Sequence, residues 1–153
     1  MVFGTFDILH IGHIRLLKYA KNLTGQDGEL IAVVARDSNV MKIKGHPPVF
    51  NEHERLEILS ELKMVDKAIL GDENDFTVPI KEWHPDIIVL GYDQSAKMTE
   101  ELIKKAGIKC KVVVAPRFIE LDVASSSEAR RRLGEILLKE LRINNQNLSM
   151  REK

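Results

Sequence analysis

Short apolar runs alternate with longer amphipathic segments along this chain. Continuous runs rich in Val and Ile predict strands at residues 29–35, 67–70, 86–91 and 111–115, and a shorter run predicts one at 1–3. Unbroken apolar runs are typical of parallel strands buried on both faces, because a strand with one wet face alternates apolar and polar residues. The strands therefore belong to a sheet that is covered on both sides.

The segments between these runs predict helices, at residues 13–21, 52–63, 77–83, 99–106 and 125–141. Two of these helices have a recognisable start. Asn51 is followed three residues later by Glu54, and Ser125 is followed by Glu128. Each pair matches a capping box, in which the two side chains satisfy free N–H groups of the first helical turn.

Alternation of strands and helices predicts the α/β class, with one Rossmann-like open parallel sheet, right-handed crossovers and helices on both faces. We expect a single domain at residues 1–142, and the polar segment 143–153 as a disordered or frayed tail. In such sheets ligands bind beyond the carboxyl ends of the strands, where the strand order reverses. The loops that follow the strands are therefore the place to look for chemistry.

Composition narrows the possibilities further. The 153 residues include 23 Lys plus Arg and 23 Asp plus Glu, so net charge gives no reason to expect nucleic acid or an anionic membrane as a partner. No apolar run approaches the ~20 residues that a membrane-spanning helix needs. The single cysteine, Cys110, has no partner for an internal disulfide, and no Cys/His spacing matches a metal site. A reducing, cytoplasmic location is expected.

The loop after the first strand carries the strongest chemical pattern, in the stretch VFGTFDILHIGH at residues 2–13. His10 and His13 are three residues apart at a helix start, so their imidazoles can point to the same side. A helix amino terminus favours anions, and Gly12 leaves room for a close ligand. These residues predict donors that stabilise charge during phosphoryl transfer. The alternative, one core and one surface histidine, suits a lone histidine better than this pair.

Three later loops carry weaker patterns, and each has a plain structural alternative. Lys42 and Lys44 form a cationic patch after the second strand, or are two solvated lysines. Asp93, in the stretch GYDQ after the fourth strand, accepts hydrogen bonds from a base or ribose, or only forms a turn. Ser125 and the two serines after it face an anion, or only cap the last helix. The arginines at 130–132 are predicted to lie on a mostly solvated helix face.

The stretch GTFDILHIGH resembles the signature of the HxGH nucleotidyltransferase superfamily, especially of its cytidylyltransferase-like branch. The later loops occur in the order of that family, and the resemblance covers residues 1–135. It implies the strand order 3-2-1-4-5, which places the HIGH and GYDQ loops across one cleft from each other. Class I aminoacyl-tRNA synthetases also carry a HIGH sequence, but they are far longer and need a lysine–serine motif that this chain lacks.

The resemblance implies roles for individual residues. The catalytic groups would be His10, His13 and Lys44. A nucleotide would bind to residues of several loops, namely Gly4, Thr5, Phe6, His10, Gly12, His13, Gly91, Asp93, Arg117, Ser125, Ser126 and Ser127. The second substrate would bind to polar side chains, namely Asp7, Lys42, Lys44 and Arg55. No dedicated metal site is expected, because the Mg²⁺ that accompanies a triphosphate is held largely by phosphate and water.

The implied reaction is in-line attack by a substrate phosphate on the α-phosphorus of a nucleoside triphosphate, with release of pyrophosphate. The stretches GYDQ, VARDSNVMKIKG and VDKAILG resemble most the archaeal FAD synthases, which join FMN to the AMP part of ATP. Glycerol-3-phosphate cytidylyltransferases, with CTP, and sugar-phosphate nucleotidyltransferases of the ADP-heptose-synthase type remain alternatives. A nucleotide-binding module without catalysis is an alternative of another class. The family resemblance also implies a homodimer.

Overall fold

The computed structural model describes residues 1–118 and 125–151, with only the backbone described for 142–151. A five-stranded parallel sheet forms its centre, in the order β3-β2-β1-β4-β5. The strands are β1 (Val2–Gly4), β2 (Ile31–Val34), β3 (Lys67–Leu70), β4 (Ile87–Leu90) and β5 (Lys111–Val114). The fold class predicted from the sequence and the strand order implied by the family resemblance are both confirmed. Because β1 pairs with both β2 and β4, the strand order reverses beside β1.

Six helices lie between and after the strands in the described part of the chain. They are α1 (Ile11–Asn22), α2 (Asp37–Lys44), α3 (Glu52–Ser60), α4 (Val78–Trp83), α5 (Ala96–Lys105) and α6 (Ser126–Arg151). Five of them correspond to predicted helices, with ends that differ by a few residues except at the end of α6. The Asn51–Glu54 and Ser125–Glu128 capping boxes are both formed. No helix among the described residues is long and apolar enough to cross a membrane.

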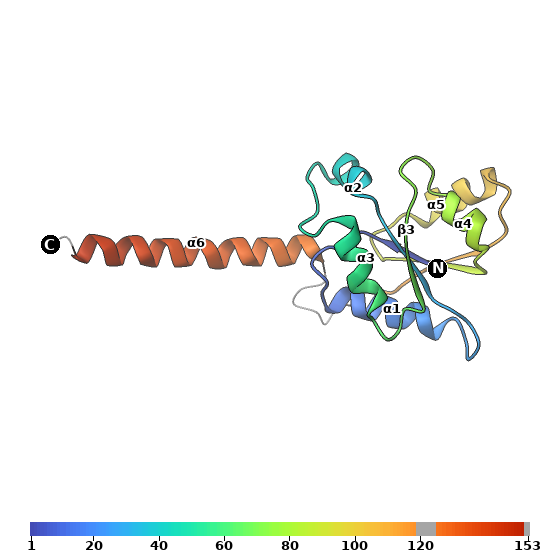
Figure 1. Cartoon of the computed structure of the whole chain (residues 1–153), viewed down its shortest axis with the longest axis horizontal. Coiled ribbons are helices and arrows are strands. Elements are labelled where there is room, and N and C mark those ends of the chain that lie inside the picture. The colour runs from blue at the N-terminus through green and yellow to red at the C-terminus, as the bar shows by residue number, and fades with distance from the viewer. Residues whose placement is uncertain (119–124, 152–153) are drawn as a thin grey trace.

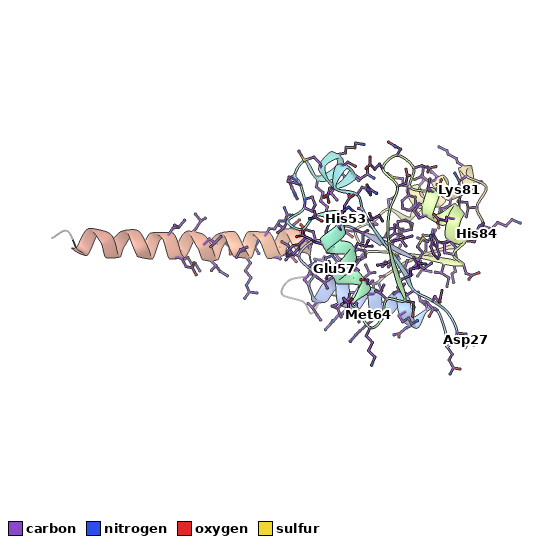
Figure 2. All side chains as sticks on the ribbon, in the orientation of Figure 1. Asp27, His53, Glu57, Met64, Lys81 and His84 are labelled. Atoms are coloured by element: carbon purple, nitrogen blue, oxygen red, sulfur yellow. The ribbon has the colours of Figure 1, made fainter. Side chains whose placement is uncertain are left out.

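Helices cover both faces of the sheet. Alternate residues of a strand point to opposite sides, so each strand contributes side chains to both layers. In β2, Ala32 and Val34 pack with residues of α1 and α3, including Leu17 and Leu59. The neighbouring Ile31 and Val33 pack on the other face with residues of α4 and α5. Polar side chains such as those of His53, Lys81 and His84 lie on the outside of these layers (Figure 2). The continuous apolar runs are therefore explained by helices on both faces.

Helix α2 was not predicted, and the reason is its weak apolar pattern. Only Val40 is buried among its eight residues, so a periodic apolar stripe is missing. Local signals still support a helix there, since Asp37 lies in the first turn and Gly45 ends the helix with a φ of 73°. The lysines expected on a loop, Lys42 and Lys44, therefore lie on the last turn of a helix.

Helix α6 continues to Arg151, whereas the sequence predicts an end near residue 141 and a disordered or frayed tail. Neither proline nor glycine occurs between residues 142 and 151, so no strong helix breaker interrupts it. The helix projects away from the rest of the molecule in Figure 1. Residues 152 and 153 of the predicted tail lie outside the described residues.

Candidate active site

The first turn of α1 brings the two histidines of the HIGH stretch into contact, with 3.8 Å between the ring centroids of His10 and His13. His10 precedes the helix, and its Nδ1 accepts a hydrogen bond from the N–H of Gly12 at 3.1 Å. The Nδ1 of His13 accepts from the N–H of His10 at 3.4 Å. Since both Nδ1 atoms accept, the proton of each neutral ring belongs on Nε2. Each Nε2–H is thereby a hydrogen-bond donor.

Burial keeps these two rings neutral. It lowers the pKa of His13 to about 3, helped by the repulsion that a protonated His10 and Lys44 would exert and opposed by the charge of Asp7. Burial also lowers the pKa of His10, against the opposing effect of the Glu128 carboxylate. The Nε2 of His10 is buried and has no hydrogen-bond partner among the described residues. Because buried polar atoms are nearly always paired, this donor points to a missing ligand.

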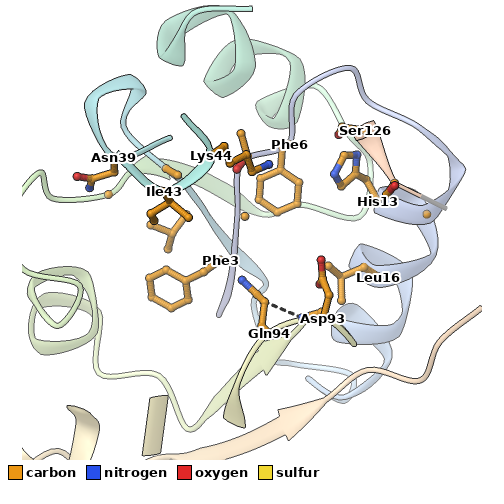
Figure 3. A pocket seen from close by; sticks show the side chains of 18 of the residues that line it. Phe3, Phe6, His13, Leu16, Asn39, Ile43, Lys44, Asp93, Gln94 and Ser126 are labelled. Carbon is orange, nitrogen blue, oxygen red and sulfur yellow. Dashed lines mark hydrogen bonds between the residues drawn. The ribbon is translucent and has the colours of Figure 1, made fainter. Parts of the chain in front are cut away.

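A cavity of about 690 Å³ opens in front of this pair, at the carboxyl edge of the sheet. Residues just after all five strands line it, namely Thr5, Ala35, Gly71, Gly91 and Ala115. This is the edge at which open α/β sheets bind their ligands, and the volume is typical of a small-molecule site. Figure 3 shows Ser126 beside His13, and Phe3 and Ile43 together on the other side.

Two parts of the lining differ in chemistry. We call one the phosphate wall, which consists of His10, His13, Lys44, Ser125, Ser126 and Ser127. We call the other the apolar wall, which consists of Phe3, Val33, Ile43, Phe76 and Pro79. Two imidazole donors, one lysine and the start of a helix can bind an anion. The apolar wall has no such groups, and it can only bury a non-polar part of a ligand.

The start of α6 is held in place beside the loop that follows β1. The Ser126 hydroxyl donates a hydrogen bond of 2.6 Å to the carbonyl of Asp7. Ser125 accepts from the N–H of Glu128 at 3.2 Å and donates its own N–H to the Glu128 carboxylate at 3.0 Å. The serines therefore cap the helix and also line the cavity. The histidine pair and the serine-started helix, far apart in sequence, meet at one site.

Asp7 was expected to contact the second substrate, but the structure gives it a structural role. Its side chain is 1% exposed and lies outside the cavity lining. It accepts hydrogen bonds from the N–H groups of Val49 and Phe50 and pairs with Arg130. Burial raises the pKa of Asp7, but these donors outweigh it and hold the pKa below its usual value. Asp7 thus ties two loops and α6 together as a carboxylate.

Arg55 was also expected at the phosphates, and the structure again places it elsewhere. The side chain is fully buried, and all three of its nitrogens donate hydrogen bonds within the protein. The acceptors are the carbonyls of Phe50, Thr5 and Ala35, together with the Asp37 carboxylate at 2.5 Å. Arg55 therefore fixes the loops after β1 and β2, which carry cavity residues, and does not reach the cavity itself.

The structure brings most of the predicted site residues to the cavity. Those in the lining are Gly4, Thr5, Phe6, His10, Gly12, His13, Lys44, Gly91, Asp93, Ser125, Ser126 and Ser127. Besides Asp7 and Arg55, two predicted residues lie outside the lining. Lys42 is exposed on α2, and the guanidinium of Arg117 lies 5.6 Å from the centroid of the Tyr92 ring.

The sequence did not indicate several residues of the cavity lining, among them the polar Asn39, Asp72, Glu73 and Asn74. Nor did it indicate the apolar wall, because residues such as Ile43 and Phe76 carry no motif and resemble core residues in a sequence. It also placed Arg130 on a solvated helix face, whereas its guanidinium pairs with Asp7 and contacts His46 at 3.0 Å. Nothing in a run of three arginines indicates which one turns inward.

The described residues contain no group of three or more His, Cys, Asp and Glu side chains that could hold a metal ion. A cation that binds together with a triphosphate needs only one or two protein carboxylates, since phosphate and water supply the other ligands. Asp93 is a carboxylate in the cavity lining. The donor set therefore fits a nucleotide-bound Mg²⁺ and does not form a cage for a free ion.

Comparisons with known proteins agree with this geometry. A model of a family described as cytidylyltransferase-like matches residues 1–132. A FAD synthase of Korarchaeum cryptofilum is 48% identical over 134 residues, which cover 86% of this chain and 88% of that relative. A FAD synthase of Thermoplasma volcanium is 45% identical over 139 residues, which cover 90% of this chain and 94% of that relative.

A solved structure is similar as well. It is the crystal structure of the lipopolysaccharide core biosynthesis protein from Thermoplasma volcanium, which is 47% identical in sequence. The TM-score is 0.70, and the match covers 76% of this chain and 93% of that one. The likeness supports the observed Rossmann-like arrangement of strands and helices.

Proposed function

Because this chain belongs to the cytidylyltransferase-like family, we propose that it transfers the AMP part of ATP to FMN, forming FAD and pyrophosphate. The relatives named FAD synthase support this choice of substrates. In the reaction, a phosphate oxygen of FMN attacks the α-phosphorus of ATP and a new P–O bond forms. The bond between the α-phosphorus and the bridging oxygen breaks, and that oxygen leaves with pyrophosphate.

The nucleophile is already an anion, so the reaction needs no strong general base. The protein must instead hold two repelling anions close together and stabilise the charge that develops between them. The phosphate wall has groups suited to both tasks. Lys44 brings a positive charge to the cavity, and the first turn of α6 brings the positive end of a helix dipole.

One observation carries the proposal, namely the buried and unpartnered Nε2 of His10 beside the ring of His13. Both rings are neutral and have their protons on Nε2, so each can donate to a phosphate oxygen. Burial makes such a bond stronger than it would be in water. The pair therefore places two neutral N–H donors where negative charge develops in the transition state.

Mg²⁺ belongs to the proposal as a companion of ATP. When bound, it would neutralise part of the charge on the triphosphate, and Asp93 is the cavity carboxylate placed after β4 to approach it. Addition of EDTA to the assay should abolish turnover, and excess Mg²⁺ should restore it. Full turnover in EDTA would remove the metal from the mechanism.

The test of the function uses the purified protein with ATP and FMN. FAD and pyrophosphate should appear in equal amounts, as measured by chromatography and a phosphate-coupled assay. CTP, and glycerol 3-phosphate as acceptor, form the comparison arms. Pyrophosphate release with glycerol 3-phosphate but not with FMN would assign the chain to another substrate. Nucleotide binding without pyrophosphate release from any pair would make it a binding module.

A second acceptor is worth including because of the similar solved structure. Its description as a lipopolysaccharide core biosynthesis protein favours a sugar phosphate, such as a heptose phosphate, as the alternative acceptor. Preferential turnover of a heptose phosphate over FMN would support this second function. The homodimer implied by the family resemblance stays a proposal, and analytical ultracentrifugation of the purified protein tests it.

A further inference from the structure

The apolar wall faces the cavity with three large side chains from separate elements. The ring of Phe3 on β1 lies 4.4 Å from that of Phe76, which precedes α4, with 39° between their planes. Ile43 on α2 is next to them in the lining and is 82% exposed. An aliphatic side chain this exposed contributes almost no hydrophobic free energy to folding. At the mouth of a cavity, such a side chain contributes hydrophobic stabilisation when a ligand covers it.

Helix α2 places opposite chemistry at two neighbouring positions. Ile43 and Lys44 are consecutive in its last turn, and both line the cavity. The helix is fixed at its start by reciprocal hydrogen bonds between Asp37 and Glu52, of 2.8 and 3.2 Å. It is fixed again where Asn39 donates to the carbonyl of Asp72 at 3.0 Å. Because α2 is fixed in this position, its Lys44 can contact a phosphate and its Ile43 an apolar group of the same ligand.

We propose that the apolar wall binds the flat aromatic ring system of the acceptor, and that Ile43 covers one face of it. This inference rests on the proposed function, since it assigns a place to the ring of FMN. The phosphate of the same molecule then lies towards Lys44 and the histidine pair, and the ribityl chain spans the distance between the two walls. Ile43, Phe76 and Phe3 select the acceptor, whereas the phosphate wall carries out the transfer.

The chemistry of the wall also discriminates between classes of acceptor. A flat aromatic ring stacks on phenyl groups and loses little when water is removed from its faces. Polar residues such as Asn39 also line the cavity. A sugar or polyol phosphate in contact with Phe3, Ile43 and Phe76 would nevertheless place hydroxyl groups against side chains that cannot form hydrogen bonds with them. Unpaired hydroxyls in such surroundings weaken binding. The apolar wall therefore favours a flavin over a heptose or glycerol phosphate.

The decisive substitution is Ile43→Ser, with Met41→Ser as the matched control. Met41 lies on the same helix, is 51% exposed and does not line the cavity. Because Ile43 is exposed, its substitution should not affect folding. We expect Ile43→Ser to raise the KM for FMN about ten-fold, as loss of one buried aliphatic side chain predicts, with the KM for ATP and kcat unchanged. Met41→Ser should leave all three at wild-type values.

A second arm tests the ring directly with D-ribitol 5-phosphate, the FMN molecule without its ring system. The wild-type protein should use it at least ~100-fold less efficiently than FMN, since all contacts with the apolar wall are lost. Phe76→Leu, which keeps an apolar group but removes the aromatic face, should raise the KM for FMN and leave that for ATP unchanged.

The two proposals fail in different ways. Absence of FAD formation by the wild-type protein would refute the proposed function itself. FAD formation by the wild type, with Ile43→Ser as active towards FMN as Met41→Ser, would refute only the assignment of the apolar wall. Equal efficiency with ribitol phosphate and FMN would also refute it.

Discussion

Two groups of polar side chains meet at the loop after β1, and they differ in how completely their hydrogen bonds are satisfied. In the histidine pair, His10 and His13, each Nδ1 accepts a hydrogen bond from a backbone N–H. The buried Nε2 of His10 has no hydrogen-bond partner among the described residues. In the support cluster, which we define as Asp7, Arg55 and Arg130, the Arg55 nitrogens all donate and the Asp7 carboxylate accepts from two N–H groups and from Arg130.

This difference indicates which group binds a ligand and which group stabilises the fold. A buried donor without a partner is costly unless a ligand completes it, so the histidine pair is suited to binding. The support cluster already uses its hydrogen bonds within the protein, so its role is to hold the loops in place. Residue type does not make this distinction, because histidine, aspartate and arginine all occur in phosphate sites. Substitutions in the two groups should therefore have different effects.

The largest effect on stability is expected for Arg55→Met in the support cluster. This change leaves the Asp37 carboxylate and three carbonyls without their donor; because Arg55 is buried but the Asp37 side chain is 38% exposed, the loss should lie near the lower end of the range for a broken buried pair, about 3 kcal/mol. Urea unfolding should show a decrease of this size in the free energy of unfolding. Arg131→Met, which breaks an exposed pair with Glu135, is the control and should cost under about 0.5 kcal/mol.

The next effect is expected in the histidine pair and concerns turnover. His13→Ala should lower kcat by ~100-fold or more, because a donor to the transition state is lost, while the protein stays folded. Circular dichroism and FAD formation measured on the same sample test both statements. His53→Ala, on the exposed surface of α3, is the control and should retain full turnover. Normal turnover of His13→Ala would show that the ring has no part in the reaction.

A smaller effect is the pH range in which each group changes the free energy of unfolding. The folded pKa of His13 is about 3 against an ordinary 6.5, so between these values the unfolded chain binds more protons. The free energy of unfolding must then fall as pH falls below 6.5, by up to ~1.4 kcal/mol per pH unit for this one site. The lowered pKa of the Asp7 carboxyl acts only below its usual value of 3.8.

Urea unfolding at pH 4.5, 5.5 and 6.5 (roughly the range where histidine titrates in the unfolded chain) measures this slope. The wild-type protein should show it, and His13→Asn should show a shallower one, with the remainder due to His10 and to carboxyl groups of lowered pKa such as Asp66. Identical slopes for both proteins would mean that the ring is not held neutral by burial.

The smallest effect is expected at Ser125, which belongs to both kinds of group. It caps α6 through the N–H of Glu128 and lines the cavity as well. Ser125→Ala should lower the free energy of unfolding by ~1 kcal/mol, as loss of a helix cap does, and should raise the KM for ATP. Ser60→Ala, at the end of α3 and away from the cavity, should leave the KM unchanged. A stability loss without a change in KM would make Ser125 a cap only.

The sequence predicted the strands well because the signal is local. In β3 the predicted and observed ends coincide, and in β2, β4 and β5 the apolar core of each run is the strand. The same holds for the histidine pair, since a spacing of three at a helix start brings two rings together without help from distant residues. Helix α2 was missed because its apolar pattern is too weak to be periodic.

What the tertiary structure alone decided is the direction in which polar and apolar side chains point. Asp7 meets Arg130 across 123 positions of the chain, and Arg55 meets Thr5 across 50, and no local pattern records such partners. Ile43 and Phe76 become one wall only because α2 and the segment after β3 end at the same edge of the sheet. Periodicity and short spacings depend on neighbours in the chain and are visible in the sequence. Burial and pairing depend on contacts between distant segments, and these exist only once the chain has folded.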